Sequence, residues 1–414
     1  MGVFQPHARY DHCPDERRIT VSVGFVTLDD LDPAQKTVLI RADFNVPVSG
    51  GVIQDDTRIR ACLPTLERLL AAPAAIILVS HLGRPKEGQY DDEFSLAPVA
   101  GHVSALLNRE VRLVPDWEQG VSLRPGEVVM LENIRFMPGE TKNNDGLARN
   151  LAGLCDIYVN DAFATAHRAQ ASTHGVTRFA PAACAGPLLV AEIETLTKAL
   201  ERPGRPMTAI VGGAKVSTKL VILENLVRKV DCLLVGGGIA NTFLKAAGRP
   251  IGNSLHEEGL VGAAADILAY ARNHDKEIPL PQDVVCAKAL AQDAEAQVKT
   301  LAEIEPDDRI LDIGPRTIEE NDRTIGSSAT ILWNGPVGVF EIEQFSAGTA
   351  ALARAVADSP ALSIAGGGDT ISAIARFGVA DGISCISTGG GAFLELLEGK
   401  TLPAIAALQE AARN

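Results

Sequence analysis

Short apolar segments rich in β-branched residues alternate with longer helical stretches along most of this 414-residue chain. Most of the short segments are continuous apolar runs, as expected for parallel strands that are covered on both faces. Helices are predicted between them, including Ile59–Ala71, Leu188–Leu200, Val216–Val230 and Ala347–Ala357. This order predicts an α/β fold with doubly wound parallel sheets. The predicted strands are Thr37–Ala42, Ala75–Ser80, Val128–Leu131, Ile157–Val159, Thr208–Val211, Cys232–Val235, Ile310–Ile313, Thr330–Trp333, Leu362–Ala365 and Ser384–Ser387.

One domain boundary stands out near the middle of the chain. The segment Phe179–Pro187 has two prolines and a glycine, the predicted helix 188–200 follows, and the sequence RPGRP comes next at 202–206. Turn-forming residues on both sides of a single helix indicate a connector between two halves of similar size. We therefore predict two doubly wound domains, 25–187 and 207–400, joined by a helical hinge over 188–206.

The composition excludes several classes of protein. Lys and Arg number 38 against 52 Asp and Glu, a net charge of −14, so bulk charge favours neither nucleic acid nor an anionic membrane as a partner. The longest apolar stretches, 69–79 and 179–191, contain prolines and fall short of the roughly 18 residues that a membrane span needs. Charged residues between 11 and 18 interrupt the apolar run of a signal peptide. The seven cysteines form no C-x-x-C pair, which favours reduced thiols in a cytoplasmic protein over a zinc site.

Arginine and histidine follow the predicted strands of the first half. Ligands of open α/β sheets bind beyond the carboxyl ends of the strands. Guanidinium groups bind carboxylate and phosphate in a bidentate fork, so a cluster of them predicts a small substrate with several negative charges. The alternative is that each arginine pairs with a nearby acid such as Asp43, Asp56 or Glu132. The residues at these junctions are Arg41, His81, Arg84, Arg135, His167 and Arg168, with Arg58 close by in sequence.

The junctions of the second half are rich in glycine. The segment GGAKVSTK at 212–219 has Lys215 and Lys219 four residues apart at the start of a predicted helix. Like charges repel at that spacing, and the N-terminal end of a helix dipole disfavours cations. A polyphosphate would reverse both penalties, because backbone N–H groups, dipole and lysines would all face an anion. The alternative is a solvated lysine face.

The segment GGGDT at 366–370 is a second candidate phosphate site. Asp369 is either the N-cap of a helix or a ligand, direct or through water, of a nucleotide-bound Mg²⁺, since a carboxylate beside phosphate is unfavourable without a cation. The triple glycines 236–238 and 389–391 allow close backbone approach, either to a ligand or between helix and sheet. The dinucleotide fingerprint G-x-G-x-x-G and the P-loop are both absent.

Taken together, these junctions resemble phosphoglycerate kinase from about Phe25 to the C-terminus. Eight segments carry the resemblance, in order and at strand ends. They are VLIRADFNVP (38–47), DDTRI (55–59), SHLGRP (80–85), LENIRF (131–136), NDAFATAHRAQAS (160–172), GGAKVSTK (212–219), WNGPVGVFE (333–341) and GGGDT (366–370).

The resemblance implies a monomeric cytoplasmic enzyme of glycolysis and gluconeogenesis that interconverts 1,3-bisphosphoglycerate plus MgADP with 3-phosphoglycerate plus MgATP. It implies that Arg58, Lys215 and Lys219 are catalytic, that Lys219 contacts phosphate, and that Asp369 faces the magnesium. The implied triose-binding residues of the N-terminal domain are Asp43, Asn45, Arg58, His81, Arg84, Arg135, His167 and Arg168, with Arg41 in the same patch. The implied nucleotide-binding residues of the C-terminal domain are Gly212, Lys219, Gly236, Gly237, Asn334, Pro336, Glu341 (at the ribose), Gly366, Gly367, Gly368, Asp369 and Thr370.

The chain departs from the family pattern in a few places. Gln170 stands where the family has a histidine, and Ala164 where glycine is usual. Residues 1–24 have no counterpart and are expected to form a flexible extension, whereas residues 401–414 are expected to pack back on the N-terminal domain.

Two other classes of protein remain as alternatives. A catalytically silent nucleotide-binding scaffold would be favoured by loss of Arg58, Lys215, Lys219 or Asp369, and all four are present. An NAD-linked oxidoreductase would share the doubly wound pattern, but it needs the missing fingerprint and has no use for the arginine cluster.

Overall fold

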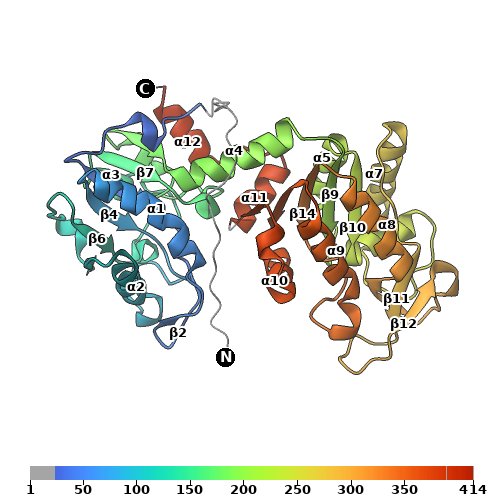
Figure 1. Ribbon diagram of the computed structural model, residues 1–414. Coiled ribbons are helices and arrows are strands. Elements are labelled where there is room, and N and C mark those ends of the chain that lie inside the picture. The colour runs from blue at the N-terminus through green and yellow to red at the C-terminus, as the bar shows by residue number, and fades with distance from the viewer. Residues whose placement is uncertain (1–23, 388, 414) are drawn as a thin grey trace. The chain divides into compact units, whose positions relative to one another are not determined.

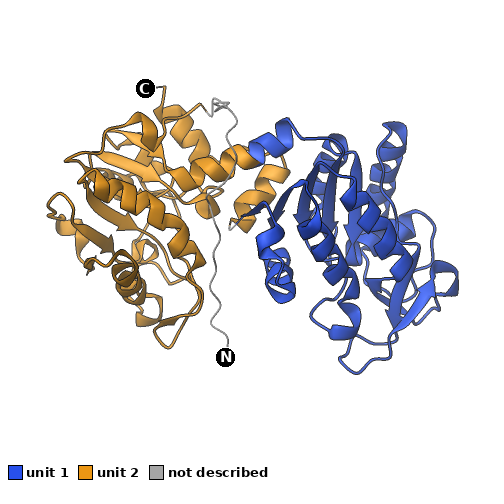
Figure 2. Ribbon diagram, viewed as in Figure 1, with its two compact units in different colours: residues 1–21, 196–387 blue, residues 22–195, 388–414 orange. Residues whose placement is uncertain are grey.

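The computed structural model describes residues 24–387 and 389–413, so nearly all of the expected extension 1–24 lies outside the described residues. The chain divides into two compact units (Figure 2). Among the described residues, unit 1 contains 196–387 and unit 2 contains 24–195 and 389–413. Residues 389–400, which the sequence pattern groups with the second domain, therefore lie in unit 2. Each unit is built around a sheet flanked by helices (Figure 1).

Unit 2 contains a six-stranded parallel sheet with the strand order β5-β6-β4-β1-β7-β8. Its strands are β1 (Thr37–Arg41), β4 (Ala75–Val79), β5 (Val111–Val114), β6 (Val128–Leu131), β7 (Ile157–Asn160) and β8 (Ala183–Ala185), and a short hairpin is formed by β2 (Val48–Ser49) and β3 (Val52–Ile53). Its helices are α1 (Thr57–Ala71), α2 (Ala97–Leu107), α3 (Asp145–Ala152), α11 (Gly390–Leu397) and α12 (Pro403–Ala411).

The continuous apolar runs fill both faces of this sheet. Side chains alternate along a strand, so Val38 and Ile40 of β1 join the cluster under α1 and α2, while Leu39 joins the cluster under α3. The same alternation recurs in β4, where Ile77 packs on the α3 side. This two-faced burial is the physical reason that the strands lack a polar face.

Unit 1 contains a five-stranded parallel sheet, ordered β10-β9-β14-β15-β16, and a three-stranded antiparallel sheet, ordered β12-β11-β13. The parallel strands are β9 (Met207–Gly212), β10 (Cys232–Gly236), β14 (Thr330–Asn334), β15 (Leu362–Gly366) and β16 (Cys385–Ser387), and the antiparallel ones are β11 (Asp283–Ala287), β12 (Gln297–Thr300) and β13 (Arg309–Ile313). The helices are α5 (Leu220–Lys229), α6 (Gly237–Ala246), α7 (Val261–Asn273), α8 (Pro315–Gly326), α9 (Ala347–Asp358) and α10 (Gly368–Phe377); α4 (Pro187–Glu201) runs across the boundary between the units.

The structure corrects two predicted elements. The segment Ile310–Ile313 is a strand, but it pairs antiparallel with β11 outside the parallel sheet. The helix predicted from Val216 begins at Leu220, because residues 217–219 form a turn.

Two general expectations can also be compared with the structure. Within the described ranges, no helix is long and apolar enough to cross a membrane. Five of the six described cysteines are buried, and none of the six is in a disulfide.

Candidate active site

The strand orders indicate where ligands bind in each unit. In unit 2, β1 lies between β4 and β7, so the direction in which successive strands are added to the sheet reverses at β1. In unit 1, β9 lies between β10 and β14, and the direction reverses there in the same way. Ligands of open α/β sheets bind at the carboxyl ends of strands at such reversals. Arg41 ends β1, and Gly212 ends β9.

Unit 2 contains a group of basic side chains that we call the basic cluster: Arg41, Arg58, His81, Arg84, Arg135, His167 and Arg168. Short polar contacts connect Arg41, His81 and Arg58. Arg41 is fully buried, and its Nη2 lies 3.1 Å from Nδ1 of His81. Asp43 Oδ1 is 3.8 Å from the same ring nitrogen, and its Oδ2 accepts a 2.8 Å hydrogen bond from Nη1 of Arg58. Arg58, in the first turn of α1, also donates to the backbone carbonyl of Asn45.

The loop after β4 brings the next members together. The side-chain oxygen of Asn45 accepts a 2.8 Å bond from the backbone N–H of Gly83, and the carbonyl of Gly83 accepts from Nη1 of Arg135. Asn133, which sequence reasoning missed, caps the turn of Arg135 through a 3.1 Å bond to its backbone N–H. Arg84 is exposed beside this loop.

The cluster members lower one another's pKa values. Burial, then the charges of Arg41, Arg135, Arg168 and Arg58, hold the pKa of His81 well below its usual range. Burial, then Arg168 and Arg41, lower the pKa of Arg135 to about 10. Burial and the neighbouring Arg84 also lower the pKa of Arg168. Such mutual repulsion is costly unless an anion binds, so these shifts favour an anionic ligand.

The alternative that each arginine pairs with a nearby acid applies to one of them. Arg58 pairs with Asp43, whereas Asp56 binds Arg60 and His102, and Glu132 accepts hydrogen bonds from the loop at Ser95 and Leu96. In the part of the chain that the structure describes, the remaining four arginines make no ion pair within 4.0 Å; these are Arg41, Arg84, Arg135 and Arg168.

The segment after β7 carries the last two members and the departure from the family pattern. Nε2 of His167 accepts a 3.1 Å bond from Nε of Arg168. A Cβ on Gly391 would lie 2.8 Å from that nitrogen, so the glycine at the start of α11 is needed for close packing against the imidazole. Gln170 is buried, and its Oε1 has no hydrogen-bond partner among residues 24–387 and 389–413.

In unit 1, Lys219 is the central cation. Its ammonium group donates to the carbonyl oxygens of Gly212, at 2.5 Å, and Asn334, at 3.1 Å, at the ends of β9 and β14. Burial lowers the pKa of Lys219 to about 8, although the negative charge of Asp369 acts in the opposite direction and raises it. Lys215 is exposed in the loop before α5, so the two lysines do not share a helical face, contrary to the sequence interpretation.

Glycines allow the loops at these strand ends to touch. A Cβ on Gly212 would lie 1.8 Å from the carbonyl oxygen of Pro336, and one on Gly236 would lie 2.5 Å from Cα of Val337. Gly212 and Gly236 are therefore required for contact between backbone segments. Glu341 is exposed, seven residues beyond the end of β14.

The GGGDT segment forms the start of α10. Gly367 is the N-cap, with a φ of 101° that favours glycine, so Asp369 lies in the first turn and is not the N-cap. Thr370 Oγ1 donates to the carbonyl of Gly366 and accepts from the backbone N–H of Gly335.

The oxygen donors near this turn fit a hard cation. The carboxylate of Asp369 is exposed, and the charge of Asp369 acts on the neighbouring Lys219. The amide nitrogen of Asn334 is bound to Gly366, which leaves its buried Oδ1 without a partner in the described structure. Carboxylate and amide oxygens are typical magnesium ligands.

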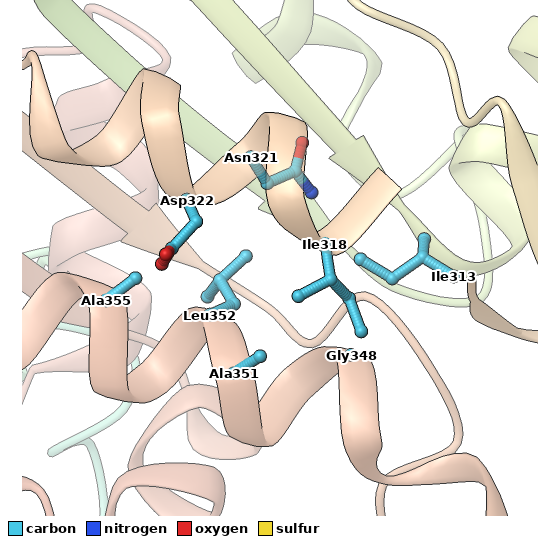
Figure 3. Close-up of a pocket in the computed structure, with 8 residues that line it drawn as sticks. All are labelled: Ile313, Ile318, Asn321, Asp322, Gly348, Ala351, Leu352 and Ala355. Carbon is cyan, nitrogen blue, oxygen red and sulfur yellow. The ribbon is translucent and has the colours of Figure 1, made fainter. Parts of the chain in front are cut away.

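Two small pockets lie in different surroundings. One, between α8 and α9, is lined largely by aliphatic side chains such as Ile318 and Leu352, and it includes none of the predicted site residues (Figure 3). The other adjoins Asp43 and Arg58, and the first turns of α4 complete its wall with Leu188 and Glu192. The second pocket is therefore the one next to the charged groups.

Comparisons with known proteins identify the family to which the chain belongs. The family model for phosphoglycerate kinase matches residues 28–400. The structure of phosphoglycerate kinase from Coxiella burnetii is similar, with a TM-score of 0.91 and 52% sequence identity over 94% of this chain and 100% of that chain. The crystal structure of phosphoglycerate kinase from Pyrococcus horikoshii OT3 matches with a TM-score of 0.78 and 34% identity over 94% of this chain and 99% of that chain. The chain therefore belongs to the phosphoglycerate kinase family and is an enzyme that transfers a phosphoryl group to the carboxyl group of phosphoglycerate.

Proposed function

We propose that the basic cluster of unit 2 binds the triose, 3-phosphoglycerate or 1,3-bisphosphoglycerate, and that the strand ends of unit 1 bind ATP or ADP. The single observation that carries this division is that four arginines without ion pairs gather at the carboxyl ends of one parallel sheet. A substrate with a carboxylate and a phosphate supplies the missing negative charge.

Each proposed role follows from the local contacts. His81 is neutral, and Arg135 and Arg168 are charged, so together they form a site for anionic oxygens. Asp43 holds Arg58 in place and is a positioning residue. In unit 1, Lys219 exchanges its bonds to two carbonyl oxygens for bonds to phosphate.

The chemistry needs no general base, because the carboxylate of 3-phosphoglycerate is already an ionised nucleophile. Catalysis then depends on alignment and on neutralising the charge of the transferring phosphoryl group. We assign this neutralisation to Arg58 and Lys215, assisted by Lys219. Mg²⁺, when bound with the nucleotide, offsets phosphate charge, and Asp369 would hold it directly or through water.

A coupled assay tests the proposal. The purified protein is mixed with ATP, Mg²⁺ and 3-phosphoglycerate, and the acyl phosphate is detected by its reductive consumption with NADH. We expect turnover that requires all three components. A protein that binds ATP but forms no acyl phosphate would be a silent scaffold, and NADH oxidation without ATP would support the oxidoreductase alternative.

A further inference from the structure

Arg41 is a buried cation whose charge is not balanced by a direct ion pair. Its side chain is fully buried at the end of β1. Its hydrogen-bond partners in the described structure are uncharged groups: Ser172 Oγ at 3.0 Å, the carbonyl of Ala42, and His81 Nδ1 at 3.1 Å. A buried charge is costly unless it is paired and hydrogen-bonded, so a compensating anion is needed nearby.

Glu140 is joined to Arg41 through Ser172. Burial raises the pKa of Glu140, whereas the charge of Arg41 and two hydrogen bonds from Ser172 lower it and favour the anion. Glu140 is fully buried, and its Oε1 accepts a 2.6 Å bond from the hydroxyl of Ser172 while its Oε2 accepts a 3.0 Å bond from the backbone N–H of Ser172. The one hydroxyl proton of Ser172 goes to Glu140, so the lone pairs of Oγ face Nε–H of Arg41. The hydroxyl thus bridges a buried carboxylate and a buried guanidinium.

This bridge also holds the segment that carries His167 and Arg168. The backbone carbonyl of Glu140 accepts from the N–H of Ala171, and the hydroxyl of buried Tyr158 donates to the carbonyl of Ser172 at 2.8 Å. The backbone N–H and carbonyl of Ser172 are therefore both hydrogen-bonded, as is its side-chain hydroxyl. Glu140 and Tyr158 thus hold the segment that follows Arg168 in place.

Through Arg41, the bridge determines the tautomer of His81. Nδ1 of His81 lies within hydrogen-bond distance of Nη2 of Arg41, which can only donate, whereas Asp43 at 3.8 Å is too far to accept from Nδ1. Nδ1 must therefore be the unprotonated nitrogen. Burial, and then the surrounding charges of Arg41, Arg135, Arg168 and Arg58, lower the pKa of His81 and favour the neutral ring, so its proton is on Nε2.

We propose that Glu140 and Ser172 are positioning residues that orient Arg41 and thereby fix His81 as the neutral Nε2–H tautomer, a hydrogen-bond donor for an anionic oxygen of the triose. The triose part of this inference rests on the proposed function. The hydrogen-bond part concerns the protein without ligand and is independent of it.

The test compares Ser172→Ala with Ser95→Ala, a matched control. Ser95 also donates from a mostly buried hydroxyl to a buried glutamate, Glu132 at 2.8 Å, but that carboxylate has no bond to Arg41. We expect Ser172→Ala to raise KM for 3-phosphoglycerate about tenfold, as for loss of a charge-assisted hydrogen bond. Its kcat and its KM for ATP should stay within about twofold of the parent values, and Ser95→Ala should change neither KM.

A spectroscopic measurement separates positioning from general damage. In ¹⁵N-histidine NMR spectra of the full chain, with His81 assigned from a His81→Gln spectrum, the parent should show a single neutral Nε2–H tautomer. Ser172→Ala should show mixed tautomers, and Ser95→Ala the parent pattern. If Ser172→Ala does not fold, Glu140→Gln serves instead, because Gln has one acceptor oxygen and cannot replace both carboxylate oxygens that accept from the N–H and the hydroxyl of Ser172.

The outcomes are distinguishable. An Nδ1–H tautomer in the parent, or an unchanged His81 signal and unchanged KM in Ser172→Ala, overturns the inference. Equal KM changes in both alanine variants would also overturn it. Absence of acyl phosphate formation by the parent overturns the proposed function, while the His81 spectrum still decides the hydrogen-bond network.

Discussion

At the scale of single residues, the surroundings of Lys219 strongly change its ionisation. Its ammonium is bound to two carbonyl oxygens and is largely removed from water, which lowers its pKa to about 8. Phosphate oxygens would supply negative charge and raise that pKa again. We therefore expect nucleotide binding to take up a proton between about pH 8 and the higher pKa of the bound state, and to take up less outside this range.

Calorimetry of ADP binding in buffers of different ionisation enthalpy measures this uptake. Lys219→Met should abolish most of it and weaken binding. Lys229→Met is the control, since this lysine lies in the last turn of the same helix, α5. Proton uptake that persists in Lys219→Met would assign the titration to another group.

Lys215 differs from Lys219 because its side chain is exposed, whereas the ammonium group of Lys219 is bound to two carbonyl oxygens. If Lys215 acts on the phosphoryl group during transfer, its loss should affect turnover more than binding. We expect Lys215→Ala to lower kcat by on the order of 10²–10³, as for removal of one oxyanion-hole donor, with a small change in nucleotide Kd. Steady-state kinetics with direct binding measurements check this, and a rise in Kd with unchanged kcat would contradict the role.

The sequence predicted the cations of the basic cluster because their positions follow from topology. Residues directly after parallel strands share one edge of the sheet, so Arg41 and His81 could be placed together from strand prediction alone. Glu140 and Ser172 could not. The bond from Arg41 to Ser172 joins residues 131 apart, and a serine or glutamate in a loop has no periodic pattern to mark it.

At the scale of elements, the start of α5 shows how tertiary bonds override a helical pattern. Ser217 donates from its backbone N–H and its hydroxyl to Glu257, and Thr218 donates to the carbonyl of Lys215. These bonds stabilise a turn over residues that the apolar pattern assigned to the helix. The helix begins only at Leu220, just before its first buried side chains.

The geometry of α10 makes a substitution of Asp369 informative. Because Gly367 is the N-cap, Asn at 369 removes charge without changing the cap. A neutral amide is a weaker ligand for a hard cation, so Asp369→Asn should raise the Mg²⁺ concentration at half-maximal activity several-fold. A magnesium titration measures this, with Asp358→Asn as a control for lost surface charge, since Asp358 ends α9 and is exposed. An unchanged half-saturation point would remove Asp369 from the proposed metal site.

Asp312 links β13 to the start of α9. Its Oδ2 accepts a 2.7 Å bond from the backbone N–H of Gly348, whereas its buried Oδ1 has no partner within the described residues. Burial raises the pKa of Asp312 to about 7. The folded protein therefore holds a proton that the unfolded chain, with a pKa near 3.8, has lost.

This difference predicts the sign of a stability change. Between these two pKa values the native state binds more protons, so the free energy of unfolding falls as pH rises. The contribution of Asp312 should fall by on the order of 2 kcal/mol from pH 5 to pH 8. Denaturant unfolding at both pH values should show a smaller pH dependence in Asp312→Asn than in the parent, and an equal dependence would refute the assignment.

At the scale of the whole molecule, the doubly wound pattern could be predicted from the sequence. Several individual strands, and the unit to which residues 389–400 belong, could not. Ten short apolar segments were predicted to be strands of parallel sheets, and nine of them are. Strand β12 was missed because three of its four residues are polar or charged, and β8 because its sequence, Ala-Cys-Ala, has little β propensity. The resemblance implied that residues 401–414 return to the N-terminal domain, but the sequence pattern placed residues 389–400 in the other domain. Gly389 and Gly391 pack against Phe163 and His167, and no local pattern encodes these contacts.

The two substrates together should make the protein more compact than either substrate alone. The proposed roles assign the triose to unit 2 and the nucleotide to unit 1, yet phosphoryl transfer requires the reacting oxygens to be in contact, with water excluded from a labile acyl phosphate. A ligand shifts a conformational equilibrium only by its differential affinity for the two states, and each substrate alone contacts one unit under this proposal. We therefore expect the radius of gyration from small-angle scattering to decrease more with 3-phosphoglycerate and a non-hydrolysable MgATP analogue together than with either alone.

Arg58→Ala should bind the nucleotide analogue normally but lose part of the additional decrease, because its guanidinium is proposed to act on the phosphoryl group from the triose side. Equal radii in the free, singly bound and doubly bound protein would show that α4 and its proline- and glycine-containing flanks do not act as a hinge.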